Sequence, residues 1–139
     1  MVLYREVFPV ERGDFASAGS ASSKIKRTLK KMGVDPSIIR EVSICSYELE
    51  LNLVIHSLGG ELVLELTERG LTLISSDRGP GIADLELVMK EGYSTAPESV
   101  RAMGFGAGMG LPNVKRHSQF FSLESEIGKG TKIRSEYSF

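Results

Sequence analysis

Residues 48–56 have the sequence ELELNLVIH, and this stretch decides how the rest of the chain is interpreted. Glu48, Asn52 and His56 are four residues apart, a spacing that places all three side chains on one face of an α-helix. The residues between them are mainly Leu, Val and Ile, so we expect a largely buried helix with one polar stripe. A buried carboxylate and a buried carboxamide are unfavourable unless something satisfies them. A hydrated magnesium ion and a nucleophile's proton would do so, and hydrogen bonds to nearby backbone are the open alternative. His56 by itself is expected to pack at the helix end.

The helix that carries this stripe is predicted to begin at Asp35-Pro36, because proline suits the first helical turn, and to run to about Ser57. An earlier helix is predicted from Phe15 to Met32, where apolar or small residues recur at three- and four-residue steps. Asp14 is its expected N-cap, and Gly33 is expected to end it.

Strands are predicted on both sides of these helices. Residues 2–10 are expected to form an edge strand, and two hairpins are expected at 61–76 and 120–138, each with glycine in its turn. Between the hairpins we expect a short helix over 83–90, a mobile loop over 91–110 and a helix over 111–117 that begins near Gly108. This order indicates a single domain over residues 1–139, of the α/β class, with one sheet and covering helices.

A second polar motif, SDRGPGI at residues 76–82, directly follows a predicted strand. Gly79 and Gly81 would let the backbone approach a flat ligand, and Asp77 would accept a hydrogen bond from an exocyclic amine such as that of adenine. The alternative is a plain strand-to-helix turn in which Asp77 is a local cap.

The third motif is GFGAGMGL at residues 104–111, with glycine at every second position. Ordering such a run loses much conformational entropy, which makes it an unusual choice for a structural loop. It leads into a predicted helix start, where free N–H groups and the helix dipole favour phosphate. A plain flexible loop is the alternative.

The composition excludes several classes of protein. A net charge of −1 argues against a dedicated binder of nucleic acid or of anionic membranes. No apolar run approaches the roughly 20 residues of a membrane span, and no signal peptide is evident, so we expect a cytoplasmic protein. The single cysteine, Cys45, is expected to be a small core residue, and a Cys/His metal site is improbable. The basic run over residues 24–31 is expected to be a solvated helix face, with docking of an acidic partner as the alternative.

The three motifs, in this order, resemble the ATP-binding superfamily of gyrase, Hsp90, histidine kinases and MutL, the GHKL or Bergerat-fold ATPases. Within it, the chain is similar to the stand-alone serine/threonine kinases that act on STAS proteins. The stretches EGYST at 91–95, GMGLPNVKR at 108–116 and ESEIGKGT at 124–131 are close to the stressosome switch kinases. The resemblance implies an α+β sandwich in which helices cover one face of a mixed, mostly antiparallel sheet, with a glycine-rich ATP lid.

The resemblance also implies a role for each matching residue. Asn52 would hold the Mg²⁺ that bridges the phosphates of ATP, Glu48 would be the general base, and Asp77 would bind the adenine amino group. The other implied nucleotide contacts are Gly79, Gly81 and Ile82 around the base, Arg101, Gly106, Gly108, Gly110 and Leu111 around the phosphates, and Thr131 on the adenine side.

The implied activity is ATP-dependent phosphorylation of a serine or threonine on a STAS-type protein, either an anti-anti-sigma factor or a stressosome component. The alternative is a nucleotide-gated binding module that captures a sigma factor or activates a PP2C-type phosphatase with little or no catalysis. Intact Glu48 and Asn52 favour the kinase, because a pure binder needs no base. The edge strand near the N-terminus would also allow pairing into a homodimer, as in the sigma-binding relatives.

Overall fold

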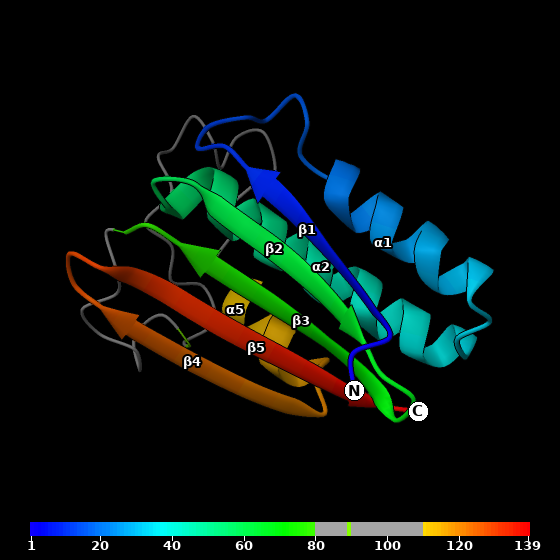
Figure 1. Cartoon of the computed structure of the whole chain (residues 1–139). Coiled ribbons are helices and arrows are strands. Elements are labelled where there is room, and N and C mark those ends of the chain that lie inside the picture. The colour runs from blue at the N-terminus through cyan, green and yellow to red at the C-terminus, as the bar shows by residue number, and fades with distance from the viewer. Residues whose placement is uncertain (80–88, 90–109) are drawn as a thin grey trace.

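The structure is a computed structural model that describes residues 1–79, 89 and 110–139. Its described strands form one five-stranded sheet in the order β1-β2-β3-β5-β4, and the helices lie together on one face of that sheet (Figure 1). The expected α/β class, with helices on one face of the sheet, is therefore confirmed. The elements are β1 (Tyr4–Val10), α1 (Ser20–Lys31), α2 (Pro36–His56), β2 (Gly60–Leu66), β3 (Gly70–Asp77), α5 (Gly110–Arg116), β4 (Phe120–Glu126) and β5 (Gly130–Ser138).

Both predicted hairpins are present, β2 with β3 and β4 with β5, and each pairs in antiparallel register. β1 lies at one edge of the sheet against β2, as predicted, and β4 forms the other edge. The pairing of β3 with β5 joins the two hairpins and brings residues far apart in sequence side by side, as in the pair Leu73↔Ser135, which are 62 positions apart. This central pairing places the start of β5 beside the end of β3, where the second sequence motif begins.

The hydrophobic core lies between the sheet and the helices. α2 is its centre, because the side chains that separate the polar residues of its stripe are buried, as the alternation of the sequence predicted. Cys45 is fully buried and free, which confirms its assignment as a small core residue. Each fully buried aliphatic side chain contributes about 1.5–3 kcal/mol, so α2 is firmly fixed against the sheet. The largest fully buried side chains include Ile25, Leu29, Leu49, Leu53, Leu62, Leu64 and Leu73.

The start of α2 agrees with the sequence prediction. Asp35 is the N-cap, and its Oδ1 accepts a hydrogen bond from the backbone N–H of Ser37 at 2.8 Å. Pro36 occupies the first helical position, where its missing N–H removes no helical hydrogen bond. Local sequence alone therefore determines where this helix begins.

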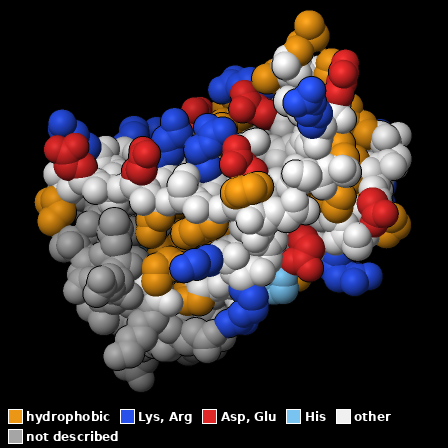
Figure 2. Space-filling view, turned by 90° about the horizontal axis from the view of Figure 1, so that it is seen from below, with side chains coloured by type: hydrophobic (Ala, Val, Ile, Leu, Met, Phe, Trp, Pro, Cys, Tyr) orange, Lys and Arg blue, Asp and Glu red, His pale blue; other side chains and the backbone are white. Residues whose placement is uncertain are grey.

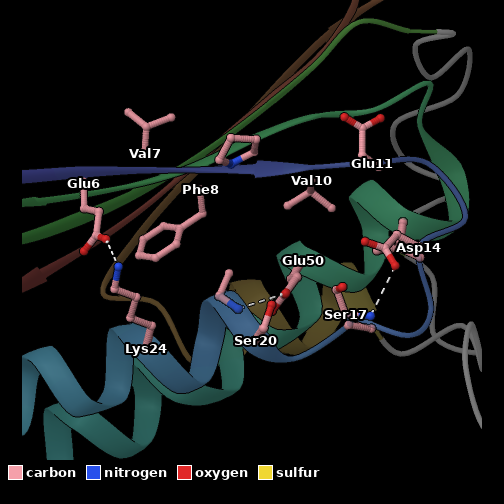
Figure 3. Close-up of a pocket in the computed structure, with 14 residues that line it drawn as sticks. Glu6, Val7, Phe8, Val10, Glu11, Asp14, Ser17, Ser20, Lys24 and Glu50 are labelled. Carbon is pink, nitrogen blue, oxygen red and sulfur yellow. Dashed lines mark hydrogen bonds and ion pairs between the residues drawn. The ribbon is translucent and has the colours of Figure 1, made fainter.

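The predicted start of α1 is wrong. The helix begins at Ser20 rather than Phe15, after a left-handed Gly19 with φ +94° that provides no side-chain cap. Asp14 instead accepts a hydrogen bond from the N–H of Ser17 at 3.2 Å, within the preceding turn. The first-turn amides of α1 are satisfied from α2, because the Glu50 carboxylate accepts hydrogen bonds from the N–H groups of residues 21 and 22, each at 3.1 Å. Figure 3 shows Glu50 beside Ser20 at the start of α1.

The basic run of α1 is a solvated helix face, as expected. Its Lys and Arg side chains are exposed, while Ile25 and Leu29 between them are fully buried. Lys24 also pairs with Glu6 of β1 at 2.6 Å. Acidic and basic side chains are interspersed over the face seen in Figure 2, rather than gathered into one basic field. Among the described helices, none is both long and apolar enough to cross a membrane.

Candidate functional site

The first and third sequence motifs meet between α2 and α5. Glu48 and Asn52 are half-buried on α2, and Gly110, the first residue of α5, lies directly against both. A Cβ atom on Gly110 would be 3.2 Å from Glu48 Oε2 and 3.5 Å from Asn52 Oδ1. A side chain at this position would therefore press on both polar groups. The end of the glycine run and the polar stripe thus form one site.

The side-chain amide nitrogen of Asn52 has no hydrogen-bond partner among the described residues. Its Nδ2 atom is buried, and no hydrogen-bond acceptor for it exists in the part of the chain that the structure describes. It is the one buried side-chain nitrogen or oxygen of this kind within the described ranges. An unsatisfied buried donor destabilises a fold by about 1–3 kcal/mol. Such a group in a native fold requires an explanation, such as a catalytic role or a bound ion or water.

The carboxyl group of Glu48 has the environment of a proton acceptor. Burial raises its pKa above the usual value, because desolvation disfavours the charged form, and a hydrogen bond from the Asn113 side chain lowers it in part. A carboxylate whose pKa is raised toward neutrality is a stronger base than an exposed one. Glu48, which is half-buried beside Gly110, is thus suited to take a proton.

The sequence did not single out two residues of α5 that support this site. Asn113 lies one helical turn after Gly110, and its Oδ1 accepts a hydrogen bond from Arg116 Nη1 at 3.2 Å. Both residues stand outside the three motifs, although they fall in the stretch over 108–116 that resembles the switch kinases, and that resemblance assigns them no role. Only the packing of α5 on α2 identifies them.

Asp77 is held rigidly at the end of β3. Its Oδ1 accepts backbone hydrogen bonds from Gly79 and from Thr131, each at 2.9 Å. The bond to Gly79 is the local cap that the sequence left open, and the bond to Thr131 links the motif to β5. Gly130 is required for this contact, since a Cβ there would overlap the Asp77 carbonyl oxygen. The Thr131 hydroxyl in turn lies 2.8 Å from that of Ser125 on β4.

The segment after Asp77 is tied to the end of α2. The N–H of Leu58 donates to the Gly79 carbonyl at 2.9 Å, and the N–H of Arg78 donates to the Gly59 carbonyl at 3.1 Å. Gly79 is buried with φ +130°, a conformation that favours glycine. The second motif therefore lies at the end of α2 where the polar stripe finishes.

Comparison with known proteins explains this arrangement. Residues 39–138 match the sequence family described as histidine kinase-, DNA gyrase B-, and HSP90-like ATPase. The match covers most of the chain and includes all three motifs. The chain belongs to this ATPase family. The resemblance drawn from the motifs and the fold that it implied are confirmed.

Two relatives indicate which members of the ATPase family this chain resembles in sequence. It is 33% identical to the serine/threonine-protein kinase RsbT of Bacillus subtilis (strain 168) over 114 residues, which are 79% of this chain and 80% of that protein. It is 32% identical to the anti-sigma F factor of Clostridium acetobutylicum (strain ATCC 824) over 107 residues, 72% of this chain and 71% of that protein. This ATPase is therefore related to both the RsbT kinase and the anti-sigma factors.

A solved structure agrees on the fold. A chain in the crystal structure of the SiaB-SiaC complex from Pseudomonas aeruginosa matches with a TM-score of 0.62, over 98% of this chain and 89% of that one. The sequence identity is 14%, so the match bears on the fold alone.

The structure describes some of the predicted site residues of this ATPase and not others. Glu48, Asn52 and Gly110 come together, and half-buried Leu111 follows on α5. Asp77, Gly79 and Thr131 form the second cluster. The predicted site residues outside the described part of the chain are Gly81, Ile82, Arg101, Gly106 and Gly108. The predicted helix over 83–90, except residue 89, and the predicted loop over 91–110, except Gly110, also lie outside it. Within the described ranges, no group of three or more His, Cys, Asp or Glu side chains is placed to hold a metal ion.

A separate pocket of about 270 Å³ lies between β1 and the start of α1 (Figure 3). Glu50 and Val54 of α2 line it, together with residues of β1 and of the turn before α1. None of the predicted site residues lines this pocket. Because Glu50 is two positions from both Glu48 and Asn52, it projects from nearly the opposite side of the helix. The pocket is therefore distinct from the candidate site between α2 and α5.

Proposed function

We propose that this chain is an ATP-dependent serine/threonine protein kinase of the cytoplasm that phosphorylates a STAS-type regulatory protein. The observation that carries the proposal is the buried Asn52 amide, which has no partner among the described residues and lies one helical turn from Glu48 and against the end of the glycine run. A hydrogen-bond donor left open beside a desolvated base is what an anionic substrate and a reacting hydroxyl would complete.

The donor set of Asn52 fits a nucleotide bound with magnesium. A carboxamide oxygen is a hard ligand of the kind that Mg²⁺ takes, and the amide nitrogen can donate to a phosphate oxygen at the same time. We assign both tasks to Asn52. When bound, Mg²⁺ would neutralise the charge of the transferring phosphoryl group.

We assign to Glu48 the proton transfer of the reaction. Its carboxylate would take the proton of the attacking seryl or threonyl hydroxyl as that oxygen bonds to the γ-phosphorus of ATP. The bond from the γ-phosphorus to the bridging oxygen breaks in the same step, and ADP leaves. Burial that raises the pKa of Glu48 supports this role, because a stronger base accepts the proton more readily.

We assign recognition of the base to the cluster around Asp77. Its Oδ1 is occupied by two backbone N–H groups, and its other oxygen would accept from the adenine amino group. The remaining contacts rest on the family resemblance alone. They are Gly79, Gly81, Ile82 and Thr131 around the base, and Arg101, Gly106, Gly108, Gly110 and Leu111 around the phosphates.

The second candidate function is a nucleotide-gated anti-sigma or phosphatase-activating module with little catalysis. The relationship to proteins named anti-sigma F factor favours it. The two candidates differ in one measurable outcome. A kinase would transfer ³²P from labelled ATP to a STAS protein, and this transfer would stop when the acceptor serine of the STAS protein is replaced by alanine. A binding module would instead hold its partner stoichiometrically without any transfer of ³²P.

Titration calorimetry with ATP and ADP, with and without Mg²⁺, tests the nucleotide site first. We expect magnesium-dependent binding that is weakened at least tenfold (about 1.4 kcal/mol) by Asn52→Ala and by Asp77→Asn. Glu61→Gln, on the exposed face of β2, is the matched control and should bind normally. If no nucleotide binds, even with candidate STAS partners present, the proposal is wrong.

A further inference from the structure

The pocket between β1 and the start of α1 combines apolar walls with a buried charge. Its volume of about 270 Å³ is close to the lower end of the range of about 300–1,000 Å³ that is typical of small-molecule sites. Phe8 and Val10 of β1 and Val54 of α2 line it, and each is at most 9% exposed. Glu50, which is 3% exposed, adds a carboxylate to this lining. An apolar cavity with a few polar groups is the usual form of a ligand site.

Three carboxylates face this cavity. Figure 3 shows Glu6 at one end and Asp14 at the other, with Glu50 between them. Glu11 also belongs to the lining, but it is exposed and points to the opposite side of β1 in the same view. Lys24 is the one basic residue that lines the pocket, and it pairs with Glu6 at 2.6 Å. Among the residues of the lining, none therefore supplies a cation to Asp14 or Glu50.

This lining excludes three classes of ligand. An anion would meet an excess of carboxylates, and the first-turn N–H groups of residues 21 and 22 are already taken by Glu50. A chelated metal ion is excluded too, because no three His, Cys, Asp or Glu side chains in the described ranges are placed to hold one. A neutral apolar molecule would displace water from the carboxylates without offering them a donor. An organic cation is the class that remains.

Lys24 shows which kind of cation the pocket accommodates. Its Nζ lies 2.6 Å from Glu6 Oε2 and 5.8 Å from the centroid of the Phe8 ring. An ammonium group is favoured both by a carboxylate at hydrogen-bond distance and by the face of an aromatic ring. Glu6 and Phe8 both line the pocket, so one end of it already holds an alkylammonium group that belongs to the chain itself.

We propose that the pocket binds a second alkylammonium group, carried by a ligand, with its charge against Asp14 and Glu50 and its aliphatic part against Val10. This site is additional to the nucleotide site, and it does not depend on the proposed kinase activity, because Glu50 projects from nearly the opposite side of α2 to Glu48. Two sources share the chemistry: a free alkylamine and the lysine side chain of another protein.

Binding is tested by NMR titration of the ¹⁵N-labelled chain with n-pentylammonium chloride. The amide signals of residues 21 and 22 report on the site, because their N–H groups donate to Glu50. These signals should shift and reach saturation with pentylammonium. They should not respond to pentanol, which has the same aliphatic chain without the charge. No saturable shift, or an equal response to pentanol, would overturn the inference.

Variants of the carboxylates test where the cation binds. Asp14→Asn removes one charge from the cavity and should weaken binding about threefold, as expected for a partly exposed ion pair. Glu11→Gln is the matched control, since this carboxylate points away from the cavity, and it should leave binding unchanged. Glu50→Gln should weaken binding at least about tenfold, and Asp14→Asn carries the test if that variant does not fold. Equal losses in Asp14→Asn and Glu11→Gln would show a response to net charge alone and overturn the inference.

A capped lysine, N-acetyl-lysine methylamide, separates the two sources. It carries the same ammonium group on a chain of the same length, with a peptide group on each side. Binding as tight as that of pentylammonium would support the proposal with a protein lysine as the source. Binding of pentylammonium alone would support it with a free amine as the source, and failure of both probes would overturn it.

Discussion

Glu48 and Glu50 are two residues apart on the same helix, yet their surroundings differ completely. Glu50 is 3% exposed, and its two carboxylate oxygens each accept a backbone N–H from the first turn of α1. These are charge-assisted bonds at a helix N-terminus, where negative charge is favourable. This side of α2 is structurally complete, since the buried carboxylate and two otherwise unpaired amides satisfy one another.

The opposite side of α2 is incomplete. Burial raises the pKa of Glu48, and the Nδ2 of Asn52 has no acceptor among the described residues. A fold that satisfies Glu50 so fully has the means to satisfy these groups as well. The difference supports the proposal that polarity on the Glu48 side serves a ligand, at some expense in stability.

The largest effect that would sharpen this comparison is on catalysis. Glu48→Gln keeps the shape of the side chain and removes its basicity, so it should slow phosphate transfer by about 10²–10⁴-fold. The affinity for Mg-ATP should stay within about twofold, because Asn52 and Asp77 are unchanged. The measurement is transfer of ³²P to a STAS protein, with calorimetry in parallel. Full activity in this variant would remove Glu48 from its assigned role.

On the Glu50 side, the corresponding change should act on stability instead. Glu50→Gln leaves one acceptor oxygen for two buried N–H groups and removes the charge, so we expect a loss of about 1–3 kcal/mol in the free energy of unfolding. Urea denaturation monitored by circular dichroism measures it. The folded variant should bind Mg-ATP normally. A neutral effect on stability, or a selective loss of nucleotide affinity, would contradict the separation of the two sides.

The sequence predicts the fold well where the determinants are local. The start of α2 is specified by Asp35, whose side chain caps the helix, and by Pro36, whose missing N–H removes no helical hydrogen bond. Both hairpins are specified by the alternation of apolar residues around glycine-containing turns. The start of α1 could not be predicted in this way. Its first-turn amides are capped by Glu50, which is 28 and 29 residues away in sequence. The local sequence does not reveal this cap and points to Asp14 instead. The signal in the sequence is Glu50 itself, a glutamate among the leucines of α2 on the side away from the polar stripe, because a carboxylate buried there needs donors from another element.

The site is predictable to a similar extent. The spacing of Glu48 and Asn52 predicts their shared face, and it needs no tertiary information. That Gly110 meets them, and that Asp77 bonds Thr131 on β5, depends on strand order and helix packing, which only the resemblance implied. Asn113 and Arg116 fall in the stretch over 108–116 that carries the resemblance, but only the structure reveals the hydrogen bond between them.

A smaller effect that would sharpen the comparison is the pH dependence of stability. The folded-state pKa of Glu48 is raised above its reference value of 4.5. Below pH 4.5 the carboxyl is protonated in both the folded and the unfolded chain, so it contributes no penalty. As the pH rises through the folded-state pKa, ionisation in the desolvated site destabilises the fold. Glu48→Gln should therefore gain stability relative to the wild type between pH 4 and pH 7, measured by urea denaturation of the ligand-free proteins. A difference that stays constant with pH, or that reverses, would show that burial does not govern this carboxyl.

The smallest expected effect is on thermal stability and concerns Asp14. Because Glu50 caps α1, Asp14 is not needed for that helix to begin. Asp14→Ala removes one bond to Ser17 in an exposed turn and should lower the melting temperature by less than about 1 °C. Asp35→Ala is the matched comparison, because it removes a real N-cap, and it should lower the melting temperature by clearly more. Equal losses in the two variants would mean that the turn over residues 14–17 stabilises α1 as a cap does. The first turn of α1 would then depend on local sequence as well as on α2, and the buried carboxylate of Glu50 would no longer suffice to explain where α1 begins.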